Sequence, residues 1–208
     1  MPTPTASDLL GPALVEYLKR YPEIKLEVIA EDRIVNLVDE GFDATIRLAR
    51  LADSTLGAIR LGTIRPVLAA APSYLERAPA LREPKDLAEH TVIGFGSKRR
   101  QTWKFVRAKS ELEVDVVPRA VSNSAPLVAQ LCAGGAGISL IPRFTALAVG
   151  LTVLEPGGWS PQPLDFMLVT PSARTPPPKL RALVDLLHSF VAARPDVFET
   201  AVPRKRTG

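Results

Sequence analysis

The sequence predicts a mixed α/β fold made of two lobes. Residues 21–48, YPEIKLEVIAEDRIVNLVDEGFDATIRL, give a strand pattern, a short helical pattern and a second strand pattern within one stretch. Such a strand–helix–strand unit is typical of a parallel sheet, and open parallel sheets bind ligands at the carboxyl ends of their strands. The chain has 208 residues, of which 46% are hydrophobic and 23% charged. This composition suits one globular domain or two small ones.

The first predicted element is a helix over residues 8–21, where apolar side chains recur at helical spacing. Ser7 or Asp8 is a plausible N-cap for it. Pro12 falls in the first turn, which can spare an amide hydrogen, and Pro22 ends the helix.

Residues 21–48 divide into three predicted elements. Alternating apolar residues predict a strand over 24–30. A short amphipathic helix follows over 34–38, with Gly41 as its left-handed cap. A second alternation predicts a strand over 42–46 that ends at Arg47.

The rest of the chain continues to mix strands and helices. Strands are predicted at 66–71, 91–95, 103–106, 112–117, 119–122, 137–141, 151–154 and 165–170, and helices or helical turns at 73–75, 84–87, 124–133, after Pro142 and at 180–191. We expect one lobe from residues 1–64 plus 164–195, a second lobe from 65–163, and a flexible tail over 196–208. Two chain crossings, near 63–65 and 163–164, would then form a hinge.

Charge and cysteine content restrict the possible classes of protein. The net charge is +4, but the basic residues gather only at 98–100 and 204–206, which we interpret as a solvated loop and a frayed tail and not as a nucleic-acid stripe. The single Cys132 excludes an internal disulfide and is expected to be a small core residue. No apolar run reaches the roughly 20 residues that span a bilayer, and no signal peptide is visible, so a cytoplasmic location is expected.

Catalysis has little support in the sequence. His90 and His188 lie far apart and outside any metal or nucleophile motif. Residues 134–137 (GGAG) follow a helix and precede a strand, the reverse of a phosphate-binding loop, so they indicate a turn. We therefore expect no enzyme activity, no metal and no cofactor.

An ordered set of motifs resembles the effector-binding domain of LysR-type transcriptional regulators. It comprises YPEIKLE at 21–27, DR at 32–33, LVDEGFDATIR at 37–47, APSYL at 71–75, PKDLAEH at 84–90, WKF at 103–105, NS at 123–124, AGGAGI at 133–138, LIP at 140–142 and PPKLRALVDLL at 177–187. The resemblance covers nearly the whole chain in order.

This resemblance implies a type 2 periplasmic-binding-protein-like fold, with a small-molecule effector held in a cleft between the two lobes. It also implies a homodimer, with assembly into a tetramer open to the full-length protein. DNA binding is implied only through an N-terminal helix-turn-helix domain that these residues lack. The helices at 8–21 and 124–133 are the candidate dimer elements. The alternative is a solute-binding protein of a transport system, because the fold is the same.

In the family, effectors bind near the start of the first helix, which here is Thr5, Ala6 and Ser7. Free amides and the helix dipole favour a carboxylate there, although Thr5 and Ser7 could instead serve only as caps. Glu31, Asp32 and Arg33 follow the predicted strand at its carboxyl end; Arg33 could hold an anion, and Asp32 could cap the next helix. Arg47 could bind a carboxylate or form an internal ion pair, and we favour the ion pair.

The second lobe offers two candidate segments. Phe95, Gly96 and Ser97 end one strand, and Asn123 and Ser124 begin a helix, with Asn123 more plausible as a cap than as a ligand contact. Trp103 and Phe105 are interpreted as core or rim residues. These donors, together with the arginines of the first lobe, favour a small organic anion as the effector.

Overall fold

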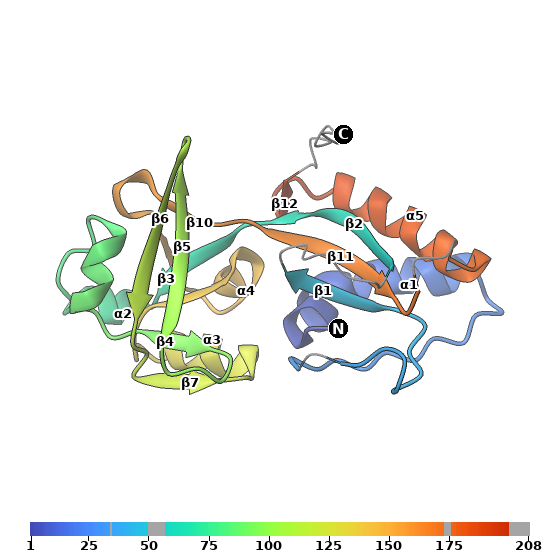
Figure 1. Cartoon of the computed structure of the whole chain (residues 1–208), viewed down its shortest axis with the longest axis horizontal. Helices are drawn as coiled ribbons and strands as arrows, with labels where there is room; N and C mark the ends of the chain where they lie inside the picture. Colours follow the sequence, from blue (N-terminus) through green and yellow to red (C-terminus); the bar gives the residue numbers. More distant parts are fainter. Residues whose placement is uncertain (34, 50–56, 173–175, 200–208) are drawn as a thin grey trace. The chain divides into compact units, whose positions relative to one another are not determined.

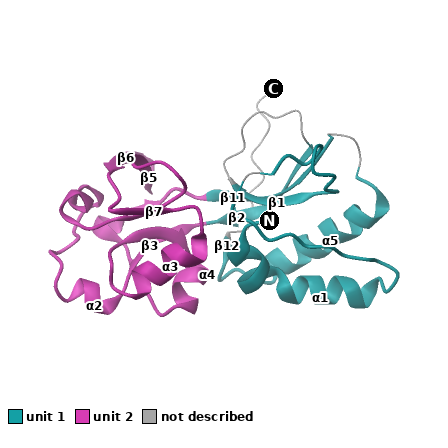
Figure 2. Ribbon diagram, turned by 90° about the horizontal axis from the view of Figure 1, so that it is seen from below, with its two compact units in different colours: residues 1–64, 164–208 teal, residues 65–163 magenta. Residues whose placement is uncertain are grey.

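The chain folds into two compact units. The computed structural model describes residues 1–33, 35–49, 57–172 and 176–199. One unit consists of Met1–Ile64 and Leu164–Gly208, and the other of Arg65–Pro163 (Figure 2). The chain therefore passes from one unit to the other after Ile64 and returns after Pro163.

Unit 1 is built on a four-stranded sheet in the order β1-β11-β2-β12 (Figure 1). The strands are β1 (Thr45–Ala49), β2 (Gly57–Ile64), β11 (Leu164–Thr170) and β12 (Phe198–Glu199). All three pairings are antiparallel. The core side of β11 is apolar, and the ring of Phe166 packs against Phe198 with 5.1 Å between centroids.

Two long helical segments belong to unit 1. The first is η1 (Thr5–Leu10), which has π-helical spacing and continues directly into α1 (Gly11–Arg20). The second is α5 (Pro178–Ala192), whose Leu180, Val184 and Leu187 are buried. The Tyr17 hydroxyl donates to the Lys179 carbonyl at 2.8 Å, so α1 and α5 are joined by a hydrogen bond as well as by apolar packing.

The first helix starts earlier than predicted. Helical backbone begins at residue 3, so Ser7 and Asp8 lie inside the helical run and neither is its N-cap. Pro12 consequently sits well inside the run instead of in its first turn. The π-helical spacing of η1 directly precedes this proline, where the missing amide hydrogen interrupts the ordinary ladder.

The predicted strand–helix–strand unit does not form as expected. Residues 24–30 belong to no strand, and residues 37–41 form a turn where a short helix was predicted over 34–38. Residue 34 lies outside the described part. Gly41 does adopt the expected left-handed backbone, with φ of +70°. β1 begins at Thr45 and pairs antiparallel with β11, so the parallel pairing expected for this stretch is wrong.

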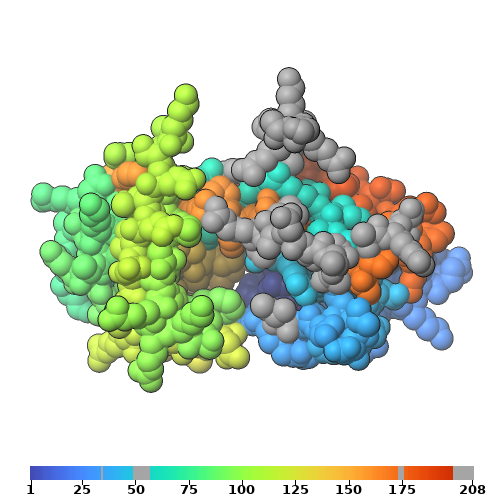
Figure 3. All heavy atoms as spheres, in the orientation of Figure 1, coloured from blue at the N-terminus to red at the C-terminus, as the bar shows by residue number. Residues whose placement is uncertain are grey.

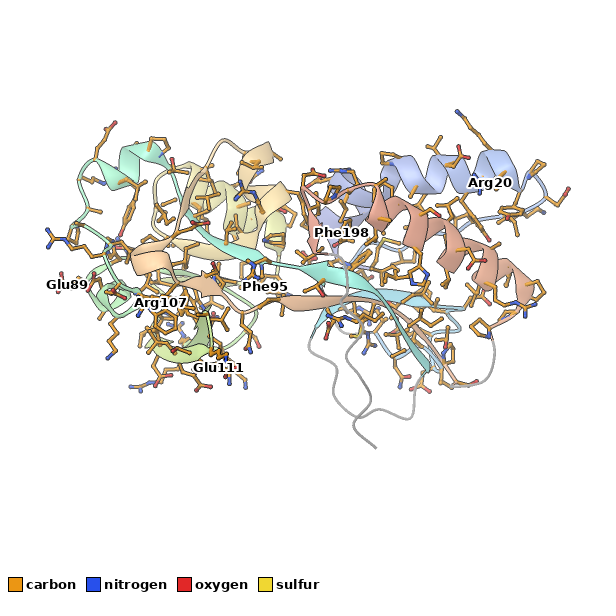
Figure 4. The ribbon with its side chains drawn as sticks, turned by 90° about the horizontal axis from the view of Figure 1, so that it is seen from above. Arg20, Glu89, Phe95, Arg107, Glu111 and Phe198 are labelled. Carbon is orange, nitrogen blue, oxygen red and sulfur yellow. The ribbon has the colours of Figure 1, made fainter. Side chains whose placement is uncertain are left out.

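The carboxyl-terminal region also differs from expectation. Residues 196–199 were expected to begin a flexible tail, but β12 pairs there with β2. Phe198 is buried and also meets Phe190 of α5, which explains why the chain is held at this point (Figure 4).

Unit 2 contains three small sheets and several short helices. Its strands are β3 (Pro66–Ala70), β4 (Ile93–Phe95), β5 (Gln101–Arg107), β6 (Ser110–Val116), β7 (Ala120–Ser122), β8 (Ser139–Pro142), β9 (Thr152–Leu154) and β10 (Ser160–Pro161). Its helices are α2 (Pro72–Leu75), η2 (Pro84–Glu89), α3 (Ala125–Ala133), α4 (Arg143–Ala148) and η3 (Pro156–Gly158). The sheets run β10-β5-β6, β8-β3-β9 and β4-β7.

Two apolar clusters fill unit 2. One gathers Trp103, Phe105 and Trp159 with side chains from β3 and the β5–β6 hairpin, which forms a ridge on the face seen in Figure 3. Arg107 covers Trp159 with its guanidinium 4.6 Å from the ring centroid. The other cluster packs Val128 and Cys132 of α3 against β3 and β8. The interpretation of Trp103 and Phe105 as core residues is confirmed.

Candidate functional site

In unit 2, two candidate segments lie at the same sheet edge. β4 and β7 are parallel partners, with Phe95 opposite Ser122 at their carboxyl ends. Residues 96–97 leave one strand, and residues 123–124 leave the other. The carboxyl edge of parallel strands is the place where open α/β sheets hold ligands. The pairing therefore brings Gly96, Ser97, Asn123 and Ser124 to one edge.

The backbone after β4 is fixed by two sets of hydrogen bonds. The Gly96 amide donates to the Ser122 carbonyl at 2.8 Å, and Gly96 has a φ of +107°, which few side-chain-bearing residues adopt. The side-chain amide of Gln101 donates to the carbonyls of Phe95 and Lys98 at 3.0 and 3.1 Å. Gln101, which sequence reasoning missed, therefore holds the turn that carries Ser97; Phe95, at the strand end, is exposed (Figure 4).

Ser124 is the N-cap of α3. Its hydroxyl accepts the Leu127 amide at 3.4 Å, while its own amide donates to the Ser122 hydroxyl at 3.0 Å. Asn123 is exposed and is not the cap. The asparagine side chain therefore lies beside the capped helix start with its amide group open to solvent.

In unit 1, the start of the first helix carries a buried hydroxyl without a partner. Thr5 is fully buried, and its Oγ1 has no hydrogen-bond partner within the described part of the chain. The Ser7 hydroxyl is exposed and donates to the Thr3 carbonyl at 3.1 Å. Ala6 donates its amide to the Pro2 carbonyl at 3.0 Å. Of these three residues, only Thr5 holds an unsatisfied polar group.

The charged residues at 31–33, near this helix start, already form hydrogen bonds or ion pairs within unit 1. Asp32 accepts the Thr3 amide at 2.9 Å, at the start of the first helical run. Arg33 pairs with Glu31 at 2.5 Å and donates to both carboxylate oxygens of Glu40. The hydrogen bonds from Arg33 lower the pKa of Glu40 and, in return, raise the pKa of Arg33. Arg33 is thus already neutralised.

Arg47 lies within β1 rather than at its end. Its guanidinium donates to the Val35 carbonyl at 2.9 Å. Within the described residues its partner is therefore a carbonyl and not the carboxylate that we favoured. Arg47 thus ties the residue two positions before the turn at 37–41 to β1.

Three further buried polar side chains in unit 2 were missed by sequence reasoning. Ser139 of β8 and Thr145 of α4 each bury a hydroxyl that has no partner among the described residues. His90 is buried beside Tyr74, with the tyrosine hydroxyl 3.2 Å from Nδ1 and the Thr91 amide donating to that hydroxyl at 3.0 Å. Local sequence patterns do not reveal such groups, because their burial depends on distant packing.

The described residues provide little for metal or covalent chemistry. They contain no group of three or more His, Cys, Asp or Glu side chains that could hold a metal ion. Burial raises the pKa of Cys132 to about 11, so its thiolate is scarce at neutral pH. No helix in the described ranges is long and apolar enough to cross a membrane.

The chain has relatives among known proteins. The sequence matches the LysR substrate binding domain family over residues 1–192. The HTH-type transcriptional regulator PtxR of Pseudomonas aeruginosa is 30% identical over 183 residues, which cover 86% of this chain and 59% of PtxR. The uncharacterized HTH-type transcriptional regulator YhjC of Escherichia coli is 31% identical over 206 residues. This match covers 92% of this chain and 65% of YhjC.

Solved structures show the same fold. The regulatory domain of CrgA, a LysR-type transcriptional regulator from Neisseria meningitidis, gives a TM-score of 0.76 at 26% identity and covers 90% of this chain and 94% of that domain. The regulatory domain of AphB in Vibrio vulnificus gives a TM-score of 0.65 at 23% identity, with 90% and 94% covered.

The fold is that of a ligand-binding domain of the type 2 periplasmic-binding-protein-like class, as predicted. The chain belongs to the LysR family of transcriptional regulators and carries their effector-binding domain. This family consists of regulators and not of enzymes, and the transport alternative is not favoured. The chain spans less than two thirds of the length of these curated relatives.

Proposed function

We propose that this domain senses a small organic anion for a longer, cytoplasmic transcriptional regulator. Membership of the LysR family supports effector binding, and the relatives' names support a helix-turn-helix partner domain outside these residues. Binding of the anion would favour one arrangement of the regulator over another, and the linked DNA-binding part would respond to that difference in free energy.

We propose one set of ligand-contacting residues in each unit. In unit 2 they are Ser97, Asn123 and Ser124, at the carboxyl edge of β4 and β7. In unit 1 they centre on Thr5, with Ala6 and Ser7 beside it. The parallel pairing of β4 with β7 is the observation that carries the proposal, because it gathers hydroxyl and amide donors at a ligand-binding edge. The remaining predicted contacts, Glu31, Asp32, Arg33, Arg47, Phe95 and Gly96, are better explained as structural supports.

The effector can be sought with thermal-shift screening of small aromatic and aliphatic carboxylic acids, followed by calorimetric titration. Thr5→Val keeps the side-chain shape and removes an unsatisfied hydroxyl, so we expect unchanged or higher stability. The same substitution should weaken binding about tenfold, because a hydrogen bond to a charged group contributes about 1.5 kcal/mol or more. Ser97→Ala should weaken binding similarly.

Ser110→Ala is the matched control, because Ser110 is exposed on β6 of unit 2 and lies outside both contact sets. It should bind as tightly as the unchanged protein. If only neutral or cationic compounds raised the melting temperature, the proposal of an anionic effector would be wrong. If Thr5→Val and Ser97→Ala both bound normally, the assigned contacts would be wrong while the sensing role stood.

We also propose that the domain forms homodimers, and that dimers can assemble into tetramers in the longer protein. The predicted dimer helices carry apolar side chains in the solvent: Val15 and Leu18 of α1 are 53% and 41% exposed, and Leu127 of α3 is 45% exposed. Exposed leucines and valines on neighbouring turns of one helix are typical of a surface that packs against another protein.

A further inference from the structure

Gln101, the first residue of β5, uses both polar atoms of its side chain in hydrogen bonds. Its Nε2 donates to the carbonyls of Phe95 and Lys98 at 3.0 and 3.1 Å, and its Oε1 accepts the indole N–H of Trp103 at 3.2 Å. Because carbonyls only accept and an indole N–H only donates, the reversed orientation of the amide would lose all three bonds. The Gln101 side chain is therefore held in a single orientation.

The hairpin that carries Gln101 is anchored in the core of unit 2. Gln101 pairs with Val116, the last residue of β6. Trp103, two residues further along β5, is buried in an apolar cluster of unit 2. Through the amide of Gln101, this packed hairpin is tied to the loop at residues 96–100, which links β4 to β5.

Gly94 of β4 leaves the space that the Gln101 amide occupies. A Cβ at position 94 would lie 2.6 Å from Gln101 Nε2 and 2.7 Å from Pro118 Cγ. Gly94 does not have a positive φ, so its backbone conformation does not require glycine. A side chain is excluded here because Gln101 and Pro118 approach the strand closely.

The loop at 96–100 presents hydrogen-bond donors and positive charge next to the candidate ligand-binding edge. The backbone amides of residues 97–99 have no hydrogen-bond partner among the described residues. The side chains of residues 98–100, one lysine and two arginines, are exposed and form no ion pair within the described part of the chain. Successive free N–H groups bind anions, and neighbouring cations add attraction. The two loop carbonyls that Gln101 engages would instead repel an anion.

We infer that Gln101 is the positioning residue of the candidate ligand-binding edge. Its amide occupies two loop carbonyls that would repel an anion, and it holds the free amides of residues 97–99 in a fixed arrangement that can receive one. This inference rests on the proposed function, because Ser97 belongs to the proposed contact set. A donor loop that is ordered before binding gives higher affinity, since the entropy cost of ordering it is not paid on binding.

The order of the loop can be measured in the unliganded 208-residue chain by ¹⁵N relaxation. Gln101→Met keeps the approximate shape and removes all three hydrogen bonds, whereas the carboxylate of Gln101→Glu can accept from Trp103 but cannot donate to the loop. Order parameters of the amides at 97–99 should be about 0.85 in the unchanged chain and should fall below about 0.6 in both variants. Gly94→Ala should have the same effect, because its Cβ would displace the Gln101 amide.

Calorimetric titration with benzoate and propionate, an aromatic and an aliphatic acid, measures the consequence for binding. Gln101→Met should weaken binding about tenfold, with the loss in the entropy of binding, because this variant must order its loop when the acid binds. The groups that contact the acid are unchanged, so the enthalpy of binding should change less.

Thr102→Ala is the matched control. Thr102 follows Gln101 in β5, and its hydroxyl donates to Asp115 at 2.7 Å, within the hairpin and not to the loop. This variant should leave both the order parameters and the affinity unchanged, although it removes a hydrogen bond from the same hairpin.

Mobile amides at 97–99 in the unchanged chain, or rigid ones in Gln101→Met, Gln101→Glu and Gly94→Ala, would overturn the inference. An equal loss of affinity in Thr102→Ala and Gln101→Met would also overturn it, since a general effect on the fold would then explain both. If no acid bound the unchanged chain, the proposed function would fail, while the relaxation measurement would still decide the role of Gln101.

Discussion

At the scale of single residues, the most consequential groups are polar side chains that folding has removed from water. His90 is one of the two histidines, and it is buried against the Tyr74 hydroxyl. Its Nε2 has no partner within the described chain. Burial lowers the pKa of His90, although Asp86 and Glu89 oppose this effect. The folded state therefore holds the imidazole neutral.

This lowered pKa predicts a loss of stability in mild acid. The unfolded chain binds a proton at His90 near the ordinary pKa of about 6.5, while the folded chain resists it until a lower pH. The contribution is therefore fully present above about pH 6.5 and is lost as the pH falls toward the lower folded pKa. Urea unfolding between pH 5 and pH 8 should show this decline.

His90→Gln should flatten that part of the pH profile, because it removes the titrating group. His188→Gln is the control, since His188 is exposed, with its Nε2 3.3 Å from the Arg60 carbonyl. A profile that keeps its slope in His90→Gln, or loses it in His188→Gln, would contradict the assignment.

At the scale of elements, the first helix shows how a proline is accommodated inside a helical run. Pro12 removes an amide hydrogen, and its ring disfavours helical backbone at the preceding residue. That residue is Gly11, which is helical with φ of −45° and ψ of −51°. Without a Cβ, Gly11 avoids the conflict with the proline ring, and the π spacing of η1 absorbs the broken ladder.

Gly11→Ala should therefore have opposite effects in two backgrounds. A Cβ at Gly11 meets no atom within 4 Å, so any penalty comes from Pro12 itself and not from packing. With Pro12 present, we expect a lower free energy of unfolding. In the Pro12→Ala background, alanine should instead stabilise the helix by about 0.5–1 kcal/mol relative to glycine. Chemical denaturation of the unchanged chain, the two single variants and the double variant gives the four free energies of unfolding of this double-mutant cycle. Equal effects of Gly11→Ala in both backgrounds would refute this account.

Elements whose pattern is local could be predicted from sequence, and those that depend on a neighbour could not. β3 is buried along its whole length, and the β5–β6 hairpin alternates, so both were found. The segment 24–30 has the same kind of alternation but no partner strand among the described residues, and a strand forms only where a partner pairs with it.

In the candidate site, too, features set by local sequence could be predicted, and those that depend on contacts with other segments could not. A helix cap at Asn123 or Ser124 followed from capping preferences, and the structure has it at Ser124, beside the residues after β4. The commitments of Asp32 to the first helix and of Arg33 to Glu40 link residues whose contact depends on how the segment between them turns. For this reason the sequence did not reveal the partners of the two arginines. Nor did it reveal that Thr5, alone among the predicted contacts, retains a buried hydroxyl with no partner in the described part of the chain.

At the scale of the whole molecule, each unit has its own buried core, and the exposed apolar residues of α1 and α3 are the candidates for contact between copies. Because such residues add little to the stability of the isolated fold, changing them should affect association more than folding.

Leu18→Glu and Leu127→Glu should each shift the domain toward monomer, with at least a tenfold weaker dimer constant, while the melting temperature of the monomer changes little. Light scattering after size-exclusion chromatography, over a range of concentrations, provides the measurement. Leu147→Glu is the control, because Leu147 is 57% exposed on α4, outside the proposed interface. An unchanged dimer in both test variants, or dissociation by the control alone, would place the interface elsewhere.

The position of the two tryptophans gives unit 2 an optical signal of its own. Both tryptophans, Trp103 and Trp159, are packed in the core of unit 2, and unit 1 has none. Indole emission excited selectively will therefore follow the melting of residues 65–163 alone. Arg107 stacked on Trp159 makes that emission sensitive to the loop around it. Comparing this signal with circular dichroism of the whole chain would show, without any label, whether the two halves of the sensor unfold together.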